Sequence, residues 1–459
     1  MIDLAKRKVL VVGLGMSGLA AARAASDLGA KVTVIDSSME PARADSVGEL
    51  EKLGVEVLLG VTSLKDMSTY DLLVASPGVP GKAAPLEAAR AAGIKVISEL
   101  ELGYRLLDNE FVAVTGTNGK TTTTELAAKM LTDGERVAVT CGNIGNPVAG
   151  LAGEVSPDDI LVAEVSSFQL ANIEEFSPRV AVLLNIAPDH YDWHTDFDDY
   201  FEAKARLIEN QETDDVVVYN EEDGHCRAIA LRARSKPVGF EGAPGSGLWV
   251  EHGKVIAGPP LFDDPIDILT LSKVKLTGRH NLHNMMAAAA LAMGAGLSRV
   301  REVAATFEGL EHRMERVLDV EGVVFYNDSK ATNPHASLHA LASFPGPLVL
   351  ILGGRNKGLD FAELSGMIAS RVADGSLAGV VLMGESAGEI RRSIGEASVL
   401  SGRMALEAQD LQDAVEKAFS ICPRPGVVLF SPACASFDMF DDYMHRGRAF
   451  KEALGGLYR

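Results

Sequence analysis

The sequence predicts an α/β protein of three domains, each built on a largely parallel sheet. The chain has 459 residues, and at about 150 residues per domain this length favours three domains. Short apolar runs rich in β-branched residues alternate with longer helical stretches, as in sheets that helices cover on both faces. Polar and glycine-rich turns follow several of these runs, at the edge where such sheets bind ligands.

The first predicted domain spans residues 1–98 and is Rossmann-like. An apolar run at 9–12 precedes Gly-Leu-Gly-Met-Ser-Gly at 13–18 and an alanine-rich helix to Leu28, and Asp36 ends the next strand. This is the dinucleotide-binding fingerprint, whose glycines let the backbone approach a diphosphate at a helix N-terminus. It indicates a nucleotide diphosphate rather than NAD in particular, and a tight turn that needs glycine only for packing is the structural alternative. Other elements are expected as strands at 31–36, 55–59, 71–75 and 94–97 and as a helix from Pro41 to Gly54.

The second predicted domain spans residues 99–309 and resembles a P-loop ATPase in its mononucleotide-binding turn. A strand at 111–114 leads into Thr-Gly-Thr-Asn-Gly-Lys-Thr-Thr at 115–122, where a helix begins. The glycine spacing is shorter than in the standard P-loop, but the physics is the same: backbone N–H groups cradle an anion, Lys120 reaches the terminal phosphates and Thr121 can hold Mg²⁺. The remaining elements are expected as strands at 160–165 and 180–184, a small β insertion at 240–276 and an apolar helix at 281–294.

Acidic and histidine residues follow the strands of this second domain. Glu164 ends a buried strand near the phosphate loop and is well placed for Mg²⁺. His190 closes Asn-Ile-Ala-Pro-Asp-His after the next strand, a position that favours a ligand. His194 lacks this support and is expected at the surface. From the residues alone, Lys204 is an ordinary lysine on a helix face, and Asn284 caps a helix or binds a base edge.

The third predicted domain spans residues 310–459 and is again Rossmann-like. Its strands are expected at 323–326, 348–352, 380–383 and 427–430, and its final helix at 439–454. Polar loops rich in small residues follow three of these strands, at 327–333, 353–357 and 431–436. Three such loops at one edge of a sheet predict a binding site.

The composition excludes some partners. Lys and Arg number 43 and Asp and Glu 63, which gives a formal net charge of −20. A field of this sign repels phosphate polymers and anionic lipid, so neither nucleic acid nor a membrane is an expected partner. The apolar stretch at 285–297 is too short to span a bilayer, and four cysteines far apart in the sequence indicate buried thiols in a reducing compartment. We therefore expect a cytoplasmic protein.

The presence of two predicted phosphate-binding elements in one chain limits the classes of enzyme that fit the sequence. A dehydrogenase needs only the first element, and a plain ATPase or kinase needs only the second. An enzyme that joins a nucleotide-linked substrate to ATP chemistry needs both.

Five motifs extend over nearly the whole chain in order: Gly-Thr-Asn-Gly-Lys-Thr at 116–121, Glu-Val-Ser-Ser-Phe-Gln at 164–169, Gly-Arg-His-Asn at 278–281, Asn-Asp-Ser-Lys-Ala-Thr at 327–332 and Ser-Pro-Ala-Cys-Ala-Ser at 431–436. Together they resemble the Mur ligases, the ATP-dependent amide-forming enzymes of peptidoglycan precursor synthesis. The Asp-Asn-Pro-Arg motif of members that add diaminopimelate or lysine is absent, which favours the members that add D-glutamate.

The resemblance implies a reaction and its substrates. ATP would phosphorylate the L-alanine carboxylate of UDP-N-acetylmuramoyl-L-alanine, and the amine of D-glutamate would attack the acyl phosphate. It also implies two Mg²⁺ sites, a carbamate formed on Lys204 with CO₂, and a monomeric enzyme. Lys204 would then be a metal ligand rather than an ordinary helix-face lysine.

The resemblance also implies a role for each motif residue, ligand by ligand. The catalytic residues would be Lys120, His190 and Lys204, and the metal ligands would be Thr121, Glu164, His190 and Lys204. The residues that contact ATP would be Gly116, Thr117, Asn118, Gly119, Lys120, Thr121, Thr122, Asn284, Arg313 and Asp328. Those that contact the UDP substrate would be Gly15, Met16, Ser17, Asp36, Gly78 and Asn143. Those that contact D-glutamate would be Lys330, Thr332, Lys357, Ser436 and Tyr443.

Three alternatives stay open at this point. A folylpolyglutamate-type ligase would share the ATP core but would not need the first domain's fingerprint. An NAD-dependent oxidoreductase would use residues 13–18 and Asp36 but would leave the loop at 116–121 without a role. A regulatory nucleotide-binding module without chemistry would leave the acidic, histidine and lysine residues near that loop unexplained.

Overall fold

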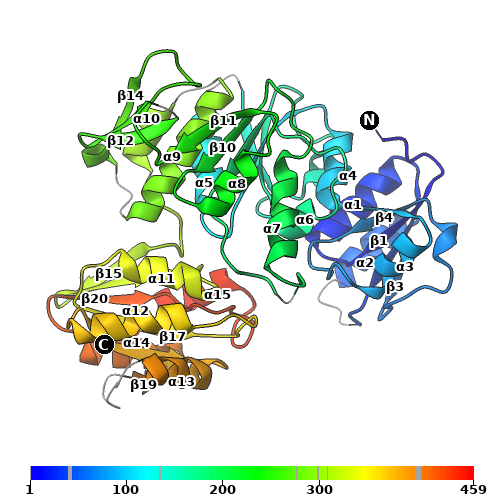
Figure 1. Ribbon diagram of the computed structural model, residues 1–459. Coiled ribbons are helices and arrows are strands. Elements are labelled where there is room, and N and C mark those ends of the chain that lie inside the picture. The colour runs from blue at the N-terminus through cyan, green and yellow to red at the C-terminus, as the bar shows by residue number, and fades with distance from the viewer. Residues whose placement is uncertain are drawn as a thin grey trace. The chain divides into compact units, whose positions relative to one another are not determined.

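The computed structural model describes residues 2–39, 44–133, 136–191, 193–245, 247–274, 278–296, 299–307, 309–397 and 405–458. The chain forms two compact units. The first comprises Met1–Ile186, Trp193–Val274 and Asn281–Phe307, and the second comprises Ala187–Asp192, Lys275–His280 and Glu308–Arg459. The first unit carries two sheets and the second carries one (Figure 1).

The N-terminal sheet has five parallel strands in the order β3-β2-β1-β4-β5. The strands are β1 (Lys8–Val12), β2 (Lys31–Asp36), β3 (Glu56–Leu59), β4 (Leu72–Ala75) and β5 (Lys95–Ser98). The strand order reverses between β1 and β4, which is the switch point where such sheets bind ligands at their carboxyl ends. The predicted parallel sheet is therefore confirmed.

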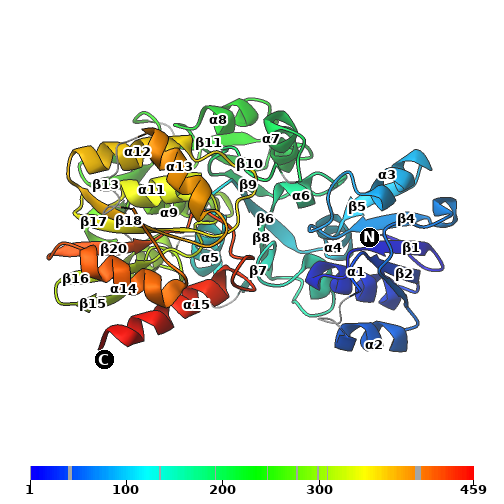
Figure 2. The same ribbon diagram turned by 90° about the horizontal axis from the view of Figure 1, so that it is seen from below.

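Helices cover both faces of this sheet (Figure 2). The helices are α1 (Met16–Asp27), α2 (Ala44–Lys52), η1 (Met67–Thr69), α3 (Ala84–Ala91) and α4 (Glu99–Leu106). Alternate residues of β1 divide between two cores: Val9 and Val11 pack with α1, α2 and α4, whereas Leu10 and Val12 pack with α3 and η1. Pro41, where α2 was predicted to begin, lies outside the described residues.

The central sheet has nine strands in the order β14-β13-β12-β11-β10-β9-β6-β8-β7. They are β6 (Glu110–Thr115), β7 (Ala138–Gly142), β8 (Ile160–Glu164), β9 (Val180–Leu183), β10 (Val216–Asn220), β11 (Lys236–Phe240), β12 (Leu248–Glu251), β13 (Lys254–Ala257) and β14 (Ile266–Thr270). The strands from β7 to β12 are parallel, and β12, β13 and β14 pair antiparallel. This antiparallel part confirms the predicted β insertion.

Helices pack on both faces of the central sheet and position the phosphate loop. They are α5 (Lys120–Leu131), η2 (Val148–Leu151), α6 (Ser167–Leu170), α7 (Phe197–Ala205), η3 (Arg206–Ile208), α8 (Gly224–Ala230), η4 (Leu271–Lys273), α9 (Arg279–Gly294) and α10 (Val300–Thr306). One core joins the sheet to α6, α7 and α8, while α5 packs against β6, β7 and β8 on the other face. The central strand β6 thus delivers the loop at 116–119 directly into the N-terminus of α5.

The sheet of the second unit has six strands in the order β15-β16-β20-β17-β18-β19. They are β15 (Glu315–Val320), β16 (Val323–Asn327), β17 (Leu348–Gly353), β18 (Leu377–Met383), β19 (Ala405–Glu407) and β20 (Gly426–Phe430). Only β15 pairs antiparallel among these strands. The carboxyl ends of β16, β20 and β17 therefore meet at one edge.

Helices cover both faces of this third sheet as well (Figure 2). The elements are α11 (Pro334–Ala342), α12 (Ala362–Ala373), α13 (Ala387–Ala397), α14 (Leu411–Ile421), α15 (Tyr443–Leu454) and η5 (Gly455–Tyr458). One core contains α11, α12 and α13, and the other contains α14 and α15. The last helix begins at Tyr443 rather than at Met439, because the Asp442 carboxylate accepts a hydrogen bond from the His445 N–H at 2.6 Å and caps the helix there.

Two further sequence expectations concern cysteine and membranes. Cys141, Cys226, Cys422 and Cys434 are buried free thiols, as predicted. None of the helices in the described ranges combines the length and the hydropathy that a bilayer crossing requires.

Candidate active site

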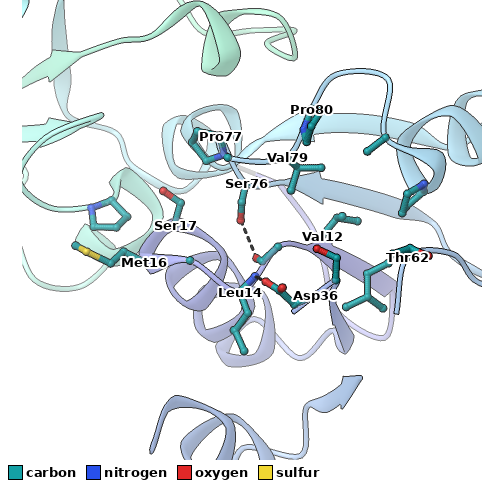
Figure 3. A pocket seen from close by; sticks show the side chains of 18 of the residues that line it. Val12, Leu14, Met16, Ser17, Asp36, Thr62, Ser76, Pro77, Val79 and Pro80 are labelled. Carbon is teal, nitrogen blue, oxygen red and sulfur yellow. Dashed lines mark hydrogen bonds between the residues drawn. The ribbon is translucent and has the colours of Figure 1, made fainter. Parts of the chain in front are cut away.

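The turn between β1 and α1 is held by side chains from the neighbouring strands. The Asp36 carboxylate accepts hydrogen bonds from the Leu14 N–H at 2.6 Å and the Ser38 N–H at 2.8 Å. The Ser76 hydroxyl donates to the Gly13 carbonyl at 2.8 Å, and both side chains point at the turn in Figure 3. Gly13 has φ +92°, and a Cβ there would lie 2.8 Å from Val79. This close approach explains why the turn begins with glycine.

A pocket of about 790 Å³ opens at this turn (Figure 3). Its walls come from the N-terminal sheet and from the loop that follows β7. Among the described residues that line it, Asp36 alone carries a charge. An anionic group there would meet backbone N–H groups and the N-terminus of α1. All six residues expected to contact the UDP substrate line the pocket: Gly15, Met16, Ser17, Asp36, Gly78 and Asn143.

The loop between β6 and α5 is fixed by Asn185, which follows β9. The Asn185 carbonyl accepts from the Thr117 N–H at 2.8 Å, and its side-chain oxygen accepts from the Asn118 N–H at 2.8 Å. The Asn185 amide group donates back to the Asn118 carbonyl at 2.9 Å. Asn185 was not among the expected site residues, although it opens the motif that ends at His190.

Two lysines converge on the carbonyl groups of this loop. Lys120 Nζ donates to the Gly116 and Thr117 carbonyls, each at 3.0 Å. Lys204 Nζ donates to the same Gly116 carbonyl at 2.9 Å and lies 3.3 Å from Thr115 Oγ1. The structure thus brings Lys204 of α7 to the phosphate loop. The two segments are too far apart in the sequence for a local pattern to predict this contact.

Burial distinguishes Lys204 from a surface lysine. Its relative exposure is 2%, and its Nζ lies 4.8 Å from the centre of the Tyr200 ring. The Tyr200 hydroxyl in turn lies 2.8 Å from Thr117 Oγ1. The description of Lys204 as an ordinary helix-face lysine is therefore wrong. The surface prediction for His194 is wrong as well, since its ring is buried and Nε2 lies 2.9 Å from Ser167 Oγ.

Glu164 connects the phosphate loop to the pocket. It ends β8, paired in register with Val114 of β6, and its Oε1 accepts from Asn143 Nδ2 at 2.9 Å. Its Oε2 is buried and has no hydrogen-bond partner among the described residues. A buried carboxylate oxygen without a donor is costly, and a cation would satisfy it. Its chemistry suits the predicted Mg²⁺ ligand role, and Thr121, the other ligand expected for this ion, lies in the first turn of α5.

Asn284 lies against the same loop from α9. It is buried, and its Oδ1 lies 3.4 Å from Thr123 Oγ1. Gly119, the N-cap of α5, has φ +91°, and a Cβ there would lie 2.3 Å from Asn284 Oδ1. A Cβ at residue 119 would therefore force the Asn284 side chain or the loop to move.

Replacing Gly119 with alanine is expected to lower the free energy of unfolding by about 1–2 kcal/mol, because the left-handed backbone and the contact with Asn284 both oppose a Cβ. It should also raise the KM for ATP. Chemical denaturation and steady-state kinetics measure the two effects. Gly48→Ala in α2 is the control, since a Cβ there meets nothing within 4 Å and should leave both values unchanged or slightly improve stability. Equal behaviour of the two variants would contradict the expectation.

His190 lies in the second unit, where it shares Asp189 with a loop lysine. His190 has φ +58°, its N–H donates to Asp189 Oδ1 at 2.9 Å, and its Nε2 lies 3.6 Å from Asp189 Oδ2. Asp189 Oδ2 also accepts from Asn333 Nδ2 at 3.0 Å, and Oδ1 lies 3.7 Å from Lys357 Nζ. Within this unit, the predicted metal ligand and a predicted D-glutamate residue thus surround one carboxylate.

Asp328 follows β16 at the binding edge of the third sheet. Its Oδ2 accepts from the Ser431 hydroxyl at 2.8 Å, and its Oδ1 accepts from the Met314 N–H at 3.2 Å. Burial raises the pKa of Asp328 to about 6, while the Ser431 hydrogen bond and the charge of Arg313 oppose this shift. The loops after β16 and β20 are therefore joined at the carboxylate expected to contact ATP.

Arg446 organises the remaining residues of this edge and was missed from the sequence. It is buried, donates to the Ser329 carbonyl at 2.7 Å and to the Cys434 carbonyl at 2.9 Å, and burial lowers its pKa to about 10. Lys330 Nζ lies 5.2 Å from the centre of the Tyr443 ring. The one signal for Arg446 was its spacing of three residues from Tyr443 on α15. The other expected residues here are Ser436, which is buried, and Thr332, which is half-buried.

Three family models match the chain in order. They are described as "Mur ligase MurD-like, N-terminal domain", at residues 7–98, "Mur ligase middle domain", at 114–292, and "Mur ligase, glutamate ligase domain", at 312–434.

Similar proteins include three named UDP-N-acetylmuramoylalanine–D-glutamate ligase. The one from Caldanaerobacter subterraneus is 36% identical over 460 residues, covering 100% of both chains. That from Koribacter versatilis is 39% identical over 99% of this chain and 98% of its own. That from Pelotomaculum thermopropionicum is 41% identical over 99% of each.

Solved structures show the same three-domain fold. The chain matches UDP-N-acetylmuramate-alanine ligase MurC from Thermotoga maritima with a TM-score of 0.57, at 21% identity over 98% of this chain and 100% of that one. It matches MurF from Acinetobacter baumannii with a TM-score of 0.61, at 16% identity over 96% and 93%.

Proposed function

The chain belongs to the Mur ligase family, and from this premise we propose that it joins D-glutamate to UDP-N-acetylmuramoyl-L-alanine in an ATP-dependent step of peptidoglycan precursor synthesis. The observation that carries the proposal is the similarity, over the full length, to relatives named for this ligation. The N-terminal pocket supports it, because a ligase that takes no UDP-linked substrate does not require a diphosphate site.

The chemistry requires both phosphate-binding elements. A carboxylate is a poor electrophile, so transfer of the γ-phosphoryl group of ATP to the L-alanine carboxylate supplies a leaving group. The amine of D-glutamate then attacks the acyl carbon, loses a proton, and inorganic phosphate departs as the amide forms. Asn143 lines the UDP pocket and donates to Glu164 beside the ATP loop, so the two elements are coupled through one side chain.

We assign ATP binding to the β6–α5 loop, with Lys120 at the terminal phosphates. The residues at 116–122 would surround the phosphates, and Asn284, Arg313 and Asp328 would contact the nucleoside, Asp328 at the ribose. Bound Mg²⁺ would neutralise phosphate charge in a protein whose net charge is −20. Thr121 and Glu164 would hold one ion, and His190 would hold a second with Lys204.

For Lys204 we propose a carbamate. The protonated amine first loses a proton. The neutral amine then attacks the carbon of CO₂, a nitrogen–carbon bond forms and the nitrogen loses a second proton, so with two protons released the side chain changes from a cation to an anion that can bind metal. The burial of Lys204 beside the phosphate loop supports this role. In the structure, Lys204 Nζ donates a hydrogen bond to the Gly116 carbonyl. In the carbamate form, the added oxygens would bind a metal cation instead.

For D-glutamate we propose the polar edge of the second unit. Lys330 and Lys357 would pair with its two carboxylates, and Thr332, Ser436 and Tyr443 would line the remainder. We further propose domains at 1–98, 99–309 and 310–459, and a monomer that works in the cytoplasm without nucleic acid or membrane.

The test is ATP-dependent phosphate release with UDP-N-acetylmuramoyl-L-alanine, Mg²⁺ and bicarbonate, comparing D-glutamate with L-glutamate, L-alanine, meso-diaminopimelate and no amino acid. We expect release with D-glutamate alone. Release with another amino acid would retain the ligase and change its substrate. No release in any reaction would contradict the enzyme and favour a binding module.

A further inference from the structure

Helix α4 carries two fully buried glutamates that are bonded differently. Glu101 accepts from the backbone N–H groups of residues 174–176, at 2.9, 2.9 and 3.0 Å, and from Arg105 Nε at 2.6 Å. Glu99 Oε1 accepts from the Ala149 N–H at 2.6 Å, whereas Glu99 Oε2 is buried and has no hydrogen-bond partner among the described residues. Glu101 is thus a satisfied structural group, and Glu99 is a partly satisfied one.

Glu99 is hydrogen-bonded to η2, the short helix that follows the pocket-lining loop at 142–147. Its partner Ala149 belongs to η2, and the preceding loop at 142–147 lines the pocket through residues that include Asn143. Helix α4 and η2 are in backbone contact, since a Cβ on Gly103 would lie 2.5 Å from the Ala149 nitrogen. If the hydrogen bond from the Ala149 N–H to Glu99 weakens, the start of η2 and the loop before it are therefore held less firmly.

The surroundings of Glu99 oppose its ionised form. Burial raises the pKa of Glu99 to about 7, although the N–H groups of Ala149 and Val148 counteract this shift. The titratable group that faces it is the thiol of Cys141, whose pKa is raised by burial and by the Glu99 carboxylate. Glu99 is therefore ionised above about pH 7 and neutral below it.

Charged groups on the elements packed against α4 pair elsewhere. β4, α6 and η2 carry no charged residue, and Glu101 on α4 itself is bonded as described above. Lys95 of β5 pairs with Glu174 at 3.0 Å, Arg23 of α1 pairs with Glu49, and Asp27 at the end of α1 is exposed. The buried face of α1 is otherwise alanine and glycine.

We propose that Glu99 is a positioning residue for the nucleotide-linked substrate: its ionised carboxylate holds η2 and the 142–147 loop in the arrangement that lines the pocket, and protonation loosens that hold. The inference rests on the proposed function only in naming the substrate as UDP-N-acetylmuramoyl-L-alanine. A carboxylate makes stronger bonds to N–H groups than a neutral acid or amide does. Substrate binding is therefore tighter at about pH 8 than at about pH 6.

The test compares wild type with Glu99→Gln, which has the same shape and the acceptor strength of the neutral acid. At about pH 8 the variant is expected to raise the KM and Kd for UDP-N-acetylmuramoyl-L-alanine about fivefold, with kcat and the KM for ATP nearly unchanged. At about pH 6 the two proteins should bind this substrate equally, because Glu99 is then neutral. Kd is measured by calorimetry without ATP, which separates binding from turnover.

Glu101→Gln is the matched control on the same helix. It removes a buried carboxylate that contacts residues 174–176 and not η2, so it should lower the melting temperature without a pH-dependent change in substrate Kd. A ratio of variant to wild-type Kd that is the same at both pH values would overturn the proposal. If Glu99→Gln does not fold, a wild-type Kd that does not weaken between about pH 8 and pH 6 would overturn it as well. If wild type catalyses no ligation but its substrate Kd shows the expected dependence on pH, the proposed function is rejected and the role of Glu99 in binding is kept.

Discussion

Lys204→Arg is expected to lower kcat by about 10³-fold, although it keeps a positive charge at the same place. Lys204 is buried on α7 with its Nζ at the Gly116 carbonyl. If the side chain acted only as a cation, the arginine variant would keep measurable activity. A carbamate cannot form on a guanidinium at working pH, and an anion that binds metal would be lost. Arginine and lysine thus separate the two possible roles of this side chain.

Three measurements accompany that variant. Wild type in CO₂-depleted buffer should lose most of its activity and regain it with bicarbonate, and isotope-labelled bicarbonate should give a carbamate NMR signal that Lys204→Arg lacks. A short carboxylate such as acetate should partly restore Lys204→Ala. Lys129→Arg on the exposed face of α5 is the control and should change nothing. Full activity of wild type without CO₂ would exclude the carbamate, whether or not the arginine variant folds.

The strands could be predicted where burial leaves a mark in the sequence itself. The run at 31–36 coincides with β2, and most other predicted strands lie within one or two residues of the observed ones. Fully buried parallel strands are continuous β-branched runs, which need no tertiary information. Five strands were not predicted: β7, β10, β11, β15 and β19. Pro237 and Gly239 interrupt the short sequence of β11, and β19 has only three residues, but β10 was missed although it begins with three valines. Sheet pairing overrides local propensity in segments such as β11.

The site could be predicted where a residue belongs to a loop at the end of a strand. The phosphate loop, Glu164 and the polar loop of Asp328 lie at carboxyl ends because a parallel sheet puts them there. The burial of polar residues outside such loops was not predictable in this way. His194 was predicted at the surface, and Glu99 and Arg446 were not singled out, yet each is buried against an element distant in sequence. Their burial depends on long-range packing, which a local cue such as the spacing of Arg446 from Tyr443 does not reveal.

Lys120→Met is expected to reduce kcat/KM for ATP by about 10³-fold, because it removes the cation assigned to the terminal phosphates. In the structure Lys120 Nζ donates to the Gly116 and Thr117 carbonyls at 3.0 Å, contacts that phosphate oxygens would replace. Methionine keeps the length and the apolar stem of lysine, so the packing of α5 should persist. The melting temperature should accordingly change little, whereas ATP-dependent phosphate release should nearly cease.

The decisive comparison for Lys120 is between the two nucleotide sites. Its side chain belongs to the β6–α5 loop, while the residues that line the UDP pocket come from the β1–α1 turn and the loop after β7. Calorimetry with Lys120→Met should therefore show an unchanged Kd for UDP-N-acetylmuramoyl-L-alanine and a much weaker one for an ATP analogue. Lys129→Met, nine residues along the same helix and exposed, should match wild type in both. Equal weakening at both sites would mean that the lysine supports the structure of the unit as a whole, and the assignment of the phosphates to this loop would then fail.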